Sequence, residues 1–212
     1  MKIKWFGQSY FLITSKDDTK IATDPFDRKL GYNVPYVEAD IVTISHDHYD
    51  HNCVSSVKGK FTCIDKPGIF ITKGIEIVGI ETFHDESRGK ERGRNIIFNF
   101  NIDGLYVCHC GDLGHVLSDD HVAMIGKVDV LLLPVGGTFT VNAARAFEVV
   151  KQLNPTVTIP MHYKTKAVSL PIDGVDKFVS IVGNSIKTGK QEIEIDENNI
   201  SKFSGVVILE YK

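Results

Sequence analysis

The chain has 212 residues, of which 42% are hydrophobic and 24% are charged, and its formal net charge is −3. This length is enough to bury one substantial core but is short for two, so we expect a single domain over residues 1–212. Because the net charge is slightly negative, we do not expect nucleic acid as a partner. The sequence has no apolar run of about 18 residues and no signal-like N-terminus, so we expect a cytosolic chain that does not span a membrane.

The chain begins with three short segments rich in β-branched and aromatic residues, Met1–Phe6, Tyr10–Thr14 and Thr19–Thr23. The Gly7-Gln8-Ser9 stretch and a charged turn separate them, which is typical of an antiparallel meander. The third strand ends at Asp24-Pro25, because proline lacks the N–H that a central strand donates.

The next strand leads directly into the densest group of metal-ligand residue types in the chain. Ala39–Ser45 is an apolar, β-branched run that predicts a buried strand. Residues 46–51 then contain three histidines and two aspartates. His46, His48 and Asp50 alternate and would face one way on an extended segment, whereas Asp50 and His51 are neighbours that cannot point together. Ligands aimed in two directions suit two metal ions; the alternative is a polar surface turn.

After this cluster the pattern predicts a short helix at His51–Val57, a strand at Phe61–Ile64 and a strand at Ile75–Phe83 that ends at His84. The loop 85–95 that follows is rich in glycine and charge. Arg88 and Arg92 in this loop are candidate substrate-binding residues, because guanidinium groups pair well with phosphate or carboxylate. The alternative is a solvated loop, which the neighbouring glutamates favour.

Asn95–Asn101 and Leu105–Cys110 predict a hairpin, with the Asp103-Gly104 turn between its strands. The second strand leads into Gly111-Asp112-Leu113-Gly114-His115. The two oxygens of Asp112 could hold two cations a few ångströms apart. His115 is a candidate for proton transfer, because the usual pKa of histidine lies in the right range.

The last third alternates strands with helices. We expect strands at 128–133, 156–160, 192–195 and 205–211, and helices at 142–153 and 172–182. Pro160-Met161-His162-Tyr163 places one more histidine at the end of a strand.

The four cysteines, Cys53, Cys63, Cys108 and Cys110, include no CxxC pair. A cytosolic chain would keep them reduced, and free cysteine is often a small buried hydrophobe, so we interpret them as packing residues. Cys108 and Cys110 would share one face of a strand, which leaves a soft-metal site as the alternative.

The motif His46-x-His48-x-Asp50-His51 resembles the H-x-H-x-D-H signature of the metallo-β-lactamase superfamily. The turn at 7–11, the Asp24-Pro25 step and the glycine-bearing loop at 134–140 are similar to elements of its small, ascorbate-6-phosphate-lactonase-like branch. The resemblance implies an α/β fold, a four-layer αββα sandwich with a metal site at one edge. Gln8 departs from the branch, which often has histidine at that position.

The resemblance also implies the ligand set. His46, His48 and His84 would hold one ion, Asp50, His51 and His162 a second, and Asp112 would bridge the two. The expected cofactors are two divalent transition-metal ions, zinc first and manganese or iron as alternatives.

We therefore expect a metal-dependent hydrolase that uses a metal-activated hydroxide to cleave a small, anionic ester, lactone or phosphoester. Asp50, Asp112 and His115 are the predicted catalytic residues. Two alternatives stay open: a nuclease or nucleotide phosphodiesterase, and a metal-binding or redox protein without hydrolytic turnover. The expected partner is a small-molecule substrate, and assembly into a homo-oligomer is left open.

Overall fold

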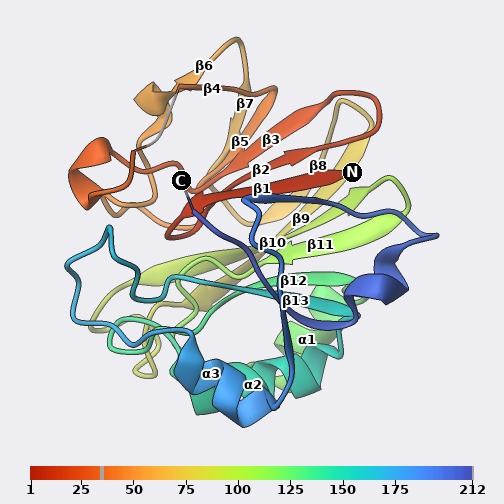
Figure 1. Cartoon of the computed structure of the whole chain (residues 1–212). Helices are drawn as coiled ribbons and strands as arrows, with labels where there is room; N and C mark the ends of the chain where they lie inside the picture. The colour runs from red at the N-terminus through yellow and green to blue at the C-terminus, as the bar shows by residue number, and fades with distance from the viewer. Residues whose placement is uncertain (34–35, 212) are drawn as a thin grey trace.

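The computed structural model describes residues 1–33 and 36–211 of the chain. Two β-sheets pack face to face, and helices cover the outer face of one of them (Figure 1). The six-stranded sheet contains β1 (Lys2–Gly7), β2 (Tyr10–Thr14), β3 (Lys20–Thr23), β5 (Ile41–Thr43), β7 (Thr62–Ile64) and β15 (Glu192–Glu194). Its strand order is β15-β1-β2-β3-β5-β7.

The second sheet has eight strands, in the order β14-β16-β13-β12-β11-β10-β9-β8. These are β8 (Gly68–Thr72), β9 (Ile75–Phe83), β10 (Arg94–Ile102), β11 (Leu105–His109), β12 (Val130–Pro134), β13 (Val157–Met161), β14 (Ser185–Lys187) and β16 (Gly205–Ile208). The strands β11, β12 and β13 are parallel, and β10 is antiparallel to both β9 and β11. It follows that β9, β11 and β13 all end at the same edge of the sheet.

The outer layers differ between the two sheets. The helices α1 (Asp119–Ile125), α2 (Ala143–Leu153) and α3 (Asp176–Val182) lie against the eight-stranded sheet (Figure 1). The six-stranded sheet is covered by the short 3-10 helices η1 (Arg28–Leu30) and η2 (Val54–Ser56) and by the paired strands β4 (Val37–Glu38) and β6 (Val57–Lys58). A third 3-10 helix, η3 (Ile200–Phe203), precedes β16. The α/β sandwich is confirmed, with one outer layer that is built from 3-10 turns and short strands.

The core explains this layering. Every residue of β12 and β13 is buried, because the helices cover one face of these strands and the other sheet covers the opposite face. Between the sheets, Trp5, Phe11 and Phe98 are fully buried. A second apolar cluster, which includes Phe26 and Val42, fills the space under η1 and β4.

Several predicted elements differ from the observed ones. The helix expected at 51–57 is wrong: the segment forms a turn, with the N–H groups of His51 and Asn52 both donating to the carbonyl of His48, and only η2 is helical. The helix expected at 172–182 begins only at Asp176, and the backbone N–H of Asp173, which precedes it, donates to the carbonyl of Gly136. The elements α1, β8 and β14 were not expected from the sequence.

The cysteine prediction holds for one pair only. All four cysteines are free, and Cys108 and Cys110 are buried in the core. Cys63 is exposed and Cys53 is half-buried, so the interpretation of these two as packing residues is wrong for Cys63.

Candidate metal centre

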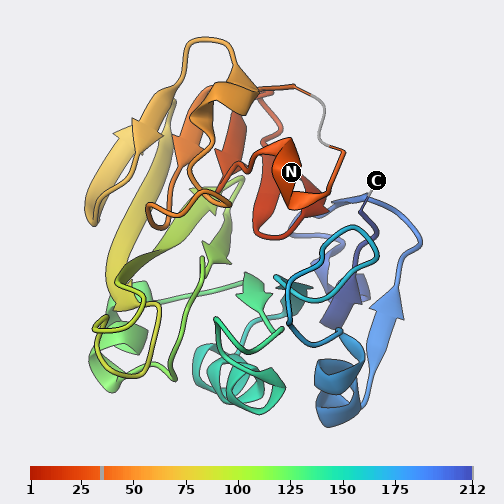
Figure 2. The same ribbon diagram turned by 90° about the vertical axis from the view of Figure 1, so that its left-hand side faces the viewer.

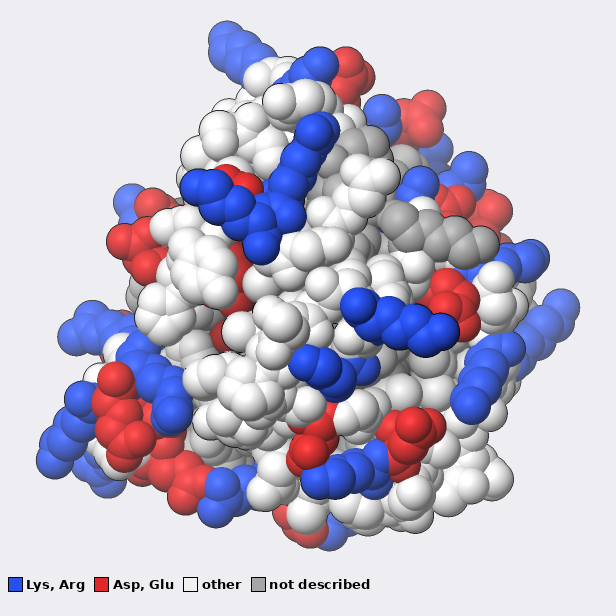
Figure 3. Space-filling model, turned by 60° about the vertical axis from the view of Figure 1, so that its left-hand side comes forward, with Lys and Arg blue, Asp and Glu red and all other residues white. Residues whose placement is uncertain are grey.

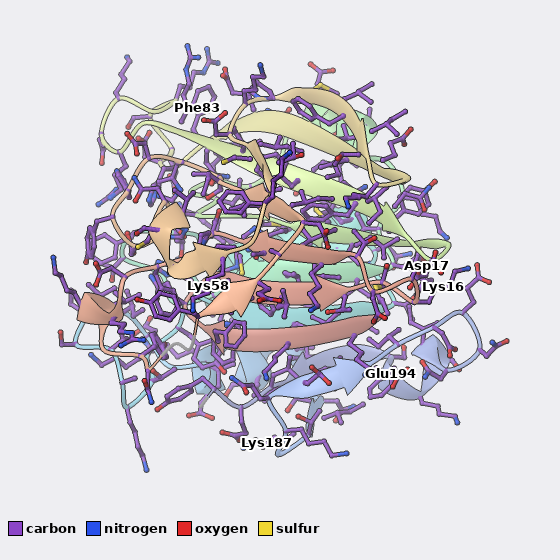
Figure 4. The ribbon with its side chains drawn as sticks, turned by 90° about the horizontal axis from the view of Figure 1, so that it is seen from above. Lys16, Asp17, Lys58, Phe83, Lys187 and Glu194 are labelled. Atoms are coloured by element: carbon purple, nitrogen blue, oxygen red, sulfur yellow. The ribbon has the colours of Figure 1, made fainter. Side chains whose placement is uncertain are left out.

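The predicted ligands lie at one edge of the sandwich, on the loops that follow four strands. His46 follows β5, His84 follows β9, Asp112 follows β11 and His162 follows β13. Figure 2 turns this edge toward the viewer and shows the loops gathered around it. In Figure 4, Phe83 at the end of β9 lies on the side of the molecule away from Lys16 and Asp17, which form the turn between β2 and β3.

Three groups of side chains are close enough to hold a metal ion, with ligand atoms within 4.8 Å of one another in each group. They are His46, His48 and His84; His46, His51 and Asp112; and Asp50, His51 and His162. We call the first group the open triad, because His48 is exposed, and the third the enclosed triad, because all its members are buried. The structure thus brings together all seven residues of the predicted ligand set.

Asp112 lies between the two triads. Its Oδ2 atom is 3.1 Å from Nε2 of His84 in the open triad and 3.3 Å from Nε2 of His162 in the enclosed triad. The Nε2 atoms of His51 and His46 lie 3.2 and 3.9 Å from the same oxygen. The other oxygen, Oδ1, is buried and has no hydrogen-bond partner among the described residues. A single carboxylate is therefore within reach of both triads.

A fully buried carboxylate, Asp24, orients the histidines from behind. It accepts hydrogen bonds from the backbone N–H and the hydroxyl of Ser45, at 2.7 and 2.6 Å, and from Nδ1 of His51 at 2.9 Å. Because the Ser45 hydroxyl donates to Asp24, its oxygen is left to accept from Nδ1 of His46 at 2.9 Å. The Nε2 atoms of His46 and His51 point into the centre with no hydrogen-bond partner among residues 1–33 and 36–211. Histidines that bind metals are held by the other ring nitrogen in this way.

The electrostatics of the centre suit a cation. Burial lowers the pKa of His46 to about 2, so its ring is neutral and can act as a ligand. Burial alone would raise the pKa of Asp112, but attraction to His162 and His51 holds it well below its usual range. Burial lowers the pKa of His51, yet Asp112 and Asp24 raise it more, to well above the usual value. A site that stabilises positive charge between buried carboxylates, and leaves nitrogen atoms unpaired, fits a metal ion.

Two further side chains position the ligands, and neither role was expected from the sequence. Gln8 Nε2 donates to Oδ2 of Asp50 at 3.1 Å. Asn95 accepts from the backbone N–H of Asp112 at 2.9 Å, while its amide donates to Thr82 and to the carbonyl of Cys110. The Gln8–Asp50 and Asn95–Asp112 contacts join residues that are distant in the chain, so no local sequence pattern indicates them.

His162 has an unusual backbone conformation, with φ +50° in the left-handed region. The adjacent loop makes room for it at Gly136, where a Cβ atom would collide with the His162 carbonyl oxygen. A non-glycine residue held in this region stores strain, and such strain is concentrated at functional sites.

A cavity of about 290 Å³ opens onto the centre. It is lined by His48, Tyr49, Asp50, His84, Arg92, Asp112, Phe139, His162 and Leu170. One wall carries the apolar side chains of Phe139 and Leu170, and the other carries ligand residues. The guanidinium carbon of Arg92 lies 5.8 Å from the centre of the Phe139 ring. The cavity therefore offers a small space with one cationic side chain beside the proposed ligands.

The loop 85–95 is folded around Asp85, whose side chain accepts backbone hydrogen bonds from Ser87, Gly89, Glu91 and Arg92 at 2.7 to 3.0 Å. This arrangement directs Arg92 toward the cavity. Arg88 instead lines a separate hollow that it shares with His115. Of the two arginines predicted to bind substrate, the structure brings Arg92 to the centre and Arg88 elsewhere.

His115 does not join the centre either. Its Nε2 accepts from the backbone N–H of Phe83 at 3.2 Å, and its Nδ1 lies 2.8 Å from the carbonyl of Val116. With one ring nitrogen accepting and the other donating to the backbone, the side chain has a structural role in this hollow. The prediction of proton transfer by His115 receives no support from its position.

In the described part of the chain, no helix is long and apolar enough to cross a bilayer.

A family profile described as "Beta-lactamase superfamily domain" matches residues 2–162. A UPF0173 metal-dependent hydrolase from Thermococcus kodakarensis is 28% identical over 194 residues, which cover 78% of this chain and 85% of the relative.

Solved structures agree with the profile. A protein from Thermotoga maritima, assigned to the Zn-dependent hydrolases of the metallo-β-lactamase superfamily, is 43% identical, with a TM-score of 0.84 over 100% of this chain and 99% of that chain. An isothiocyanate hydrolase from Delia radicum gut bacteria shares the fold alone, with 13% identity and a TM-score of 0.70 over 98% of this chain and 95% of that chain. The narrower resemblance to the ascorbate-6-phosphate-lactonase-like branch stays a prediction. Because the profile spans more than half of the sequence and the Thermotoga relative matches its full length, the chain belongs to the metallo-β-lactamase superfamily.

Proposed function

We propose that this metal-dependent hydrolase holds two divalent transition-metal ions and uses them to cleave a small anionic ester, lactone or phosphoester. The observation that carries the proposal is the position of Asp112, whose Oδ2 atom lies 3.1 Å from His84 and 3.3 Å from His162. These histidines belong to different triads, so one carboxylate can serve both ions. Two ions in such a centre are typically about 3.5–4 Å apart.

The donor atoms support zinc as the first choice. Imidazole nitrogen and carboxylate oxygen are common zinc ligands, and the same set also suits manganese or iron. The open triad would hold one ion through three histidines, and the enclosed triad the other through two histidines and Asp50.

The bound ions would supply Lewis acidity, which polarises a carbonyl or phosphoryl oxygen and lowers the pKa of water. The protein positions this chemistry. Asp112 holds the two triads at a common carboxylate, and Asp24 fixes the ring orientation of His51 and, through Ser45, that of His46. Phe139 and Leu170 exclude water from one wall of the cavity.

The cavity supports a small substrate. Pockets for small molecules usually measure about 300–1,000 Å³, and this one, at about 290 Å³, lies just below that range. Arg92 is the cationic side chain in the lining, apart from the histidines, so a carboxylate or phosphate on the substrate would find a charge-assisted partner there. A substrate that combines an anionic group with a small apolar part fits this lining.

The surface is less favourable for a nuclease. On the face shown in Figure 3, Lys and Arg side chains are interspersed with Asp, Glu and uncharged residues and form no continuous basic stripe over the described residues. Binding to nucleic acid depends mainly on contacts between cationic side chains and phosphates. The net charge of −3 points the same way, as does the small cavity.

Metal analysis followed by a substrate panel tests the proposal. Protein prepared with controlled zinc, manganese or iron should bind two equivalents, and turnover should require them. The panel contains neutral and anionic esters, lactones, phosphodiesters and single-stranded RNA. Hydrolysis of anionic small molecules supports the proposal. Selective cleavage of RNA would favour the nuclease, and full metal content with no hydrolysis of any class would favour a protein without hydrolytic turnover.

A further inference from the structure

The turn at Gly7-Gln8-Ser9, between β1 and β2, is polar but deeply buried. Gln8 and Ser9 are both 0% exposed. The backbone of Gln8 has φ +49°, in the left-handed region that non-glycine residues rarely adopt. Burial of a polar turn with a strained backbone is costly, so its surroundings must compensate.

The first compensation comes from contacts with the enclosed triad. The side-chain amide of Gln8 donates to Oδ2 of Asp50 at 3.1 Å. The carbonyl oxygen of Gln8 accepts from the backbone N–H of His162 at 3.1 Å. One residue of the turn therefore contacts two members of the enclosed triad, and these two lie 112 residues apart in the chain.

The second compensation comes from His109, at the end of β11. Its Nε2 lies 2.8 Å from the carbonyl oxygen of Ser9, and its Nδ1 accepts from the backbone N–H of Gly111 at 3.2 Å. Because the Gly111 N–H can only donate, Nδ1 must be unprotonated and the proton must be on Nε2. One neutral tautomer satisfies both bonds. The ring thus ties the turn to the residue directly before Asp112.

The backbone at Gly111 is equally constrained. It has φ +54°, and a Cβ atom at this position would collide with Asn95 and Ser45. Asn95 also accepts the N–H of Asp112. The Asp112 segment is therefore held by two hydrogen bonds, from the N–H of Asp112 to Asn95 and from the N–H of Gly111 to His109.

We propose that Gln8 and His109 are positioning residues, which through the 7–9 turn set the relative positions of Asp50, Asp112 and His162. The inference rests on the proposed two-ion centre. Ligand geometry must hold to within about 0.5 Å for such a centre to work. A single buried turn that contacts the loops after β5 and β13 directly, and the loop after β11 through His109, can hold three ligands from different strands.

The proposal predicts an asymmetry between the two residues. Gln8 contacts Asp50 of the enclosed triad, so its loss should weaken the ion held there and spare the ion of the open triad. His109 acts on the Asp112 segment, which is shared, so its loss should weaken both ions. A turn that only satisfied its own polar groups would produce neither pattern.

The test compares wild type with Gln8→Glu, which keeps the shape but places a carboxylate opposite Asp50, and with His109→Phe, which keeps a ring but removes both hydrogen bonds. Gln8→His and His109→Gln are the conservative variants, because each retains an N–H donor. Phe11→Leu is the matched control: the Phe11 ring packs against His109, with ring centres 6.0 Å apart, and carries no hydrogen-bonding group. Metal equivalents, affinity by chelator competition, the Co(II) absorption spectrum and the Tm of metal-free protein are measured.

We expect wild type to bind two ions and Gln8→Glu to lose or weaken one of them at least ~10-fold, the range of an outer-shell partner. His109→Phe should weaken both and change the Co(II) spectrum. The conservative variants should recover part of the loss, and Phe11→Leu should lower the Tm while binding both ions normally.

Unchanged affinity and spectrum in Gln8→Glu and His109→Phe, with a fall in Tm like that of Phe11→Leu, would overturn the positioning role and leave the two-ion proposal intact. If His109→Phe does not fold, Gln8→Glu decides the question alone: wild-type affinity and spectrum in Gln8→Glu would be the contrary result. Fewer than two equivalents in wild type would overturn the two-ion centre and the positioning role together.

Discussion

The open triad and the enclosed triad contain similar ligands but differ in their surroundings. His48 of the open triad is exposed, whereas His51 and His162 of the enclosed triad are 0% and 1% exposed, although each triad contributes two residues to the cavity lining. The enclosed triad is also held from behind, since Asp24 bonds to His51 and Gln8 bonds to Asp50. If both triads bind ions as proposed, the ligands of the enclosed triad are the more firmly positioned before metal binding, because their side chains are buried and hydrogen-bonded.

The largest effect should come from Asp112, because its Oδ2 atom lies within 3.3 Å of a histidine from each triad. Asp112→Asn keeps the shape and removes the charge. We expect kcat/KM to fall more than ~100-fold, beyond the range of an outer-shell partner, and metal content to fall below two equivalents, with little change in the Tm of metal-free protein. Asp129→Asn is the control, since Asp129 is a buried carboxylate that accepts from the backbone of Tyr106. Full activity and metal content in Asp112→Asn would show that it is not the shared ligand.

The second-largest effect on metal binding should come from the loss of Asp24, which should weaken both triads. It orients His51 directly and His46 through Ser45. For Asp24→Asn we expect metal affinity or activity to fall ~10- to 100-fold. Chelator competition should show both ions affected. An effect on the enclosed ion alone would mean that Ser45 orients His46 without help from the carboxylate.

Removing one ligand from each triad tests the comparison itself. His48→Ala and His162→Ala should each reduce the metal content from two equivalents toward one. His162→Ala should also lower the Tm, because it removes a buried ring, whereas His48→Ala should leave the Tm of metal-free protein nearly unchanged. Elemental analysis and thermal unfolding measure both effects. If neither substitution changes the metal content, the assignment of ligands is wrong.

The smallest effect concerns substrate choice at the open side. Arg92→Gln should lower kcat/KM for an anionic substrate about 10-fold, because a charge-assisted contact of roughly 1.5–3 kcal/mol is weakened by partial exposure. A neutral analogue should be little affected, and the loss should shrink in high salt. Arg88→Gln is the matched control, since Arg88 lines a different hollow. Equal changes for both substrates, or an equal loss in Arg88→Gln, would remove Arg92 from substrate recognition.

Much of the site could be predicted from sequence, because metal ligands belong to a few residue types that can be recognised individually in the chain. The crowding of histidine and aspartate at 46–51 indicated a metal site, and the resemblance to the superfamily added His84, Asp112 and His162, which the structure brings into the same cluster. The longer strands were also predictable, since buried β-branched runs have few other interpretations. Short elements such as α1 and β8 were missed, because their patterns extend over too few residues.

The sequence by itself therefore determined the strands and the metal-ligand cluster at 46–51, which follow from periodicity and residue identity, and its motif carried the resemblance that implied the superfamily, the sandwich and the remaining ligands. Only the tertiary structure decided which groups surround those ligands. It placed Asp24, Gln8 and Asn95 behind them, brought Arg92 to the cavity, and directed Arg88 and His115 to a separate hollow. The physical reason is that these contacts join segments distant in the chain, and their geometry is set by strand order and loop paths, which depend on the packing of the whole core.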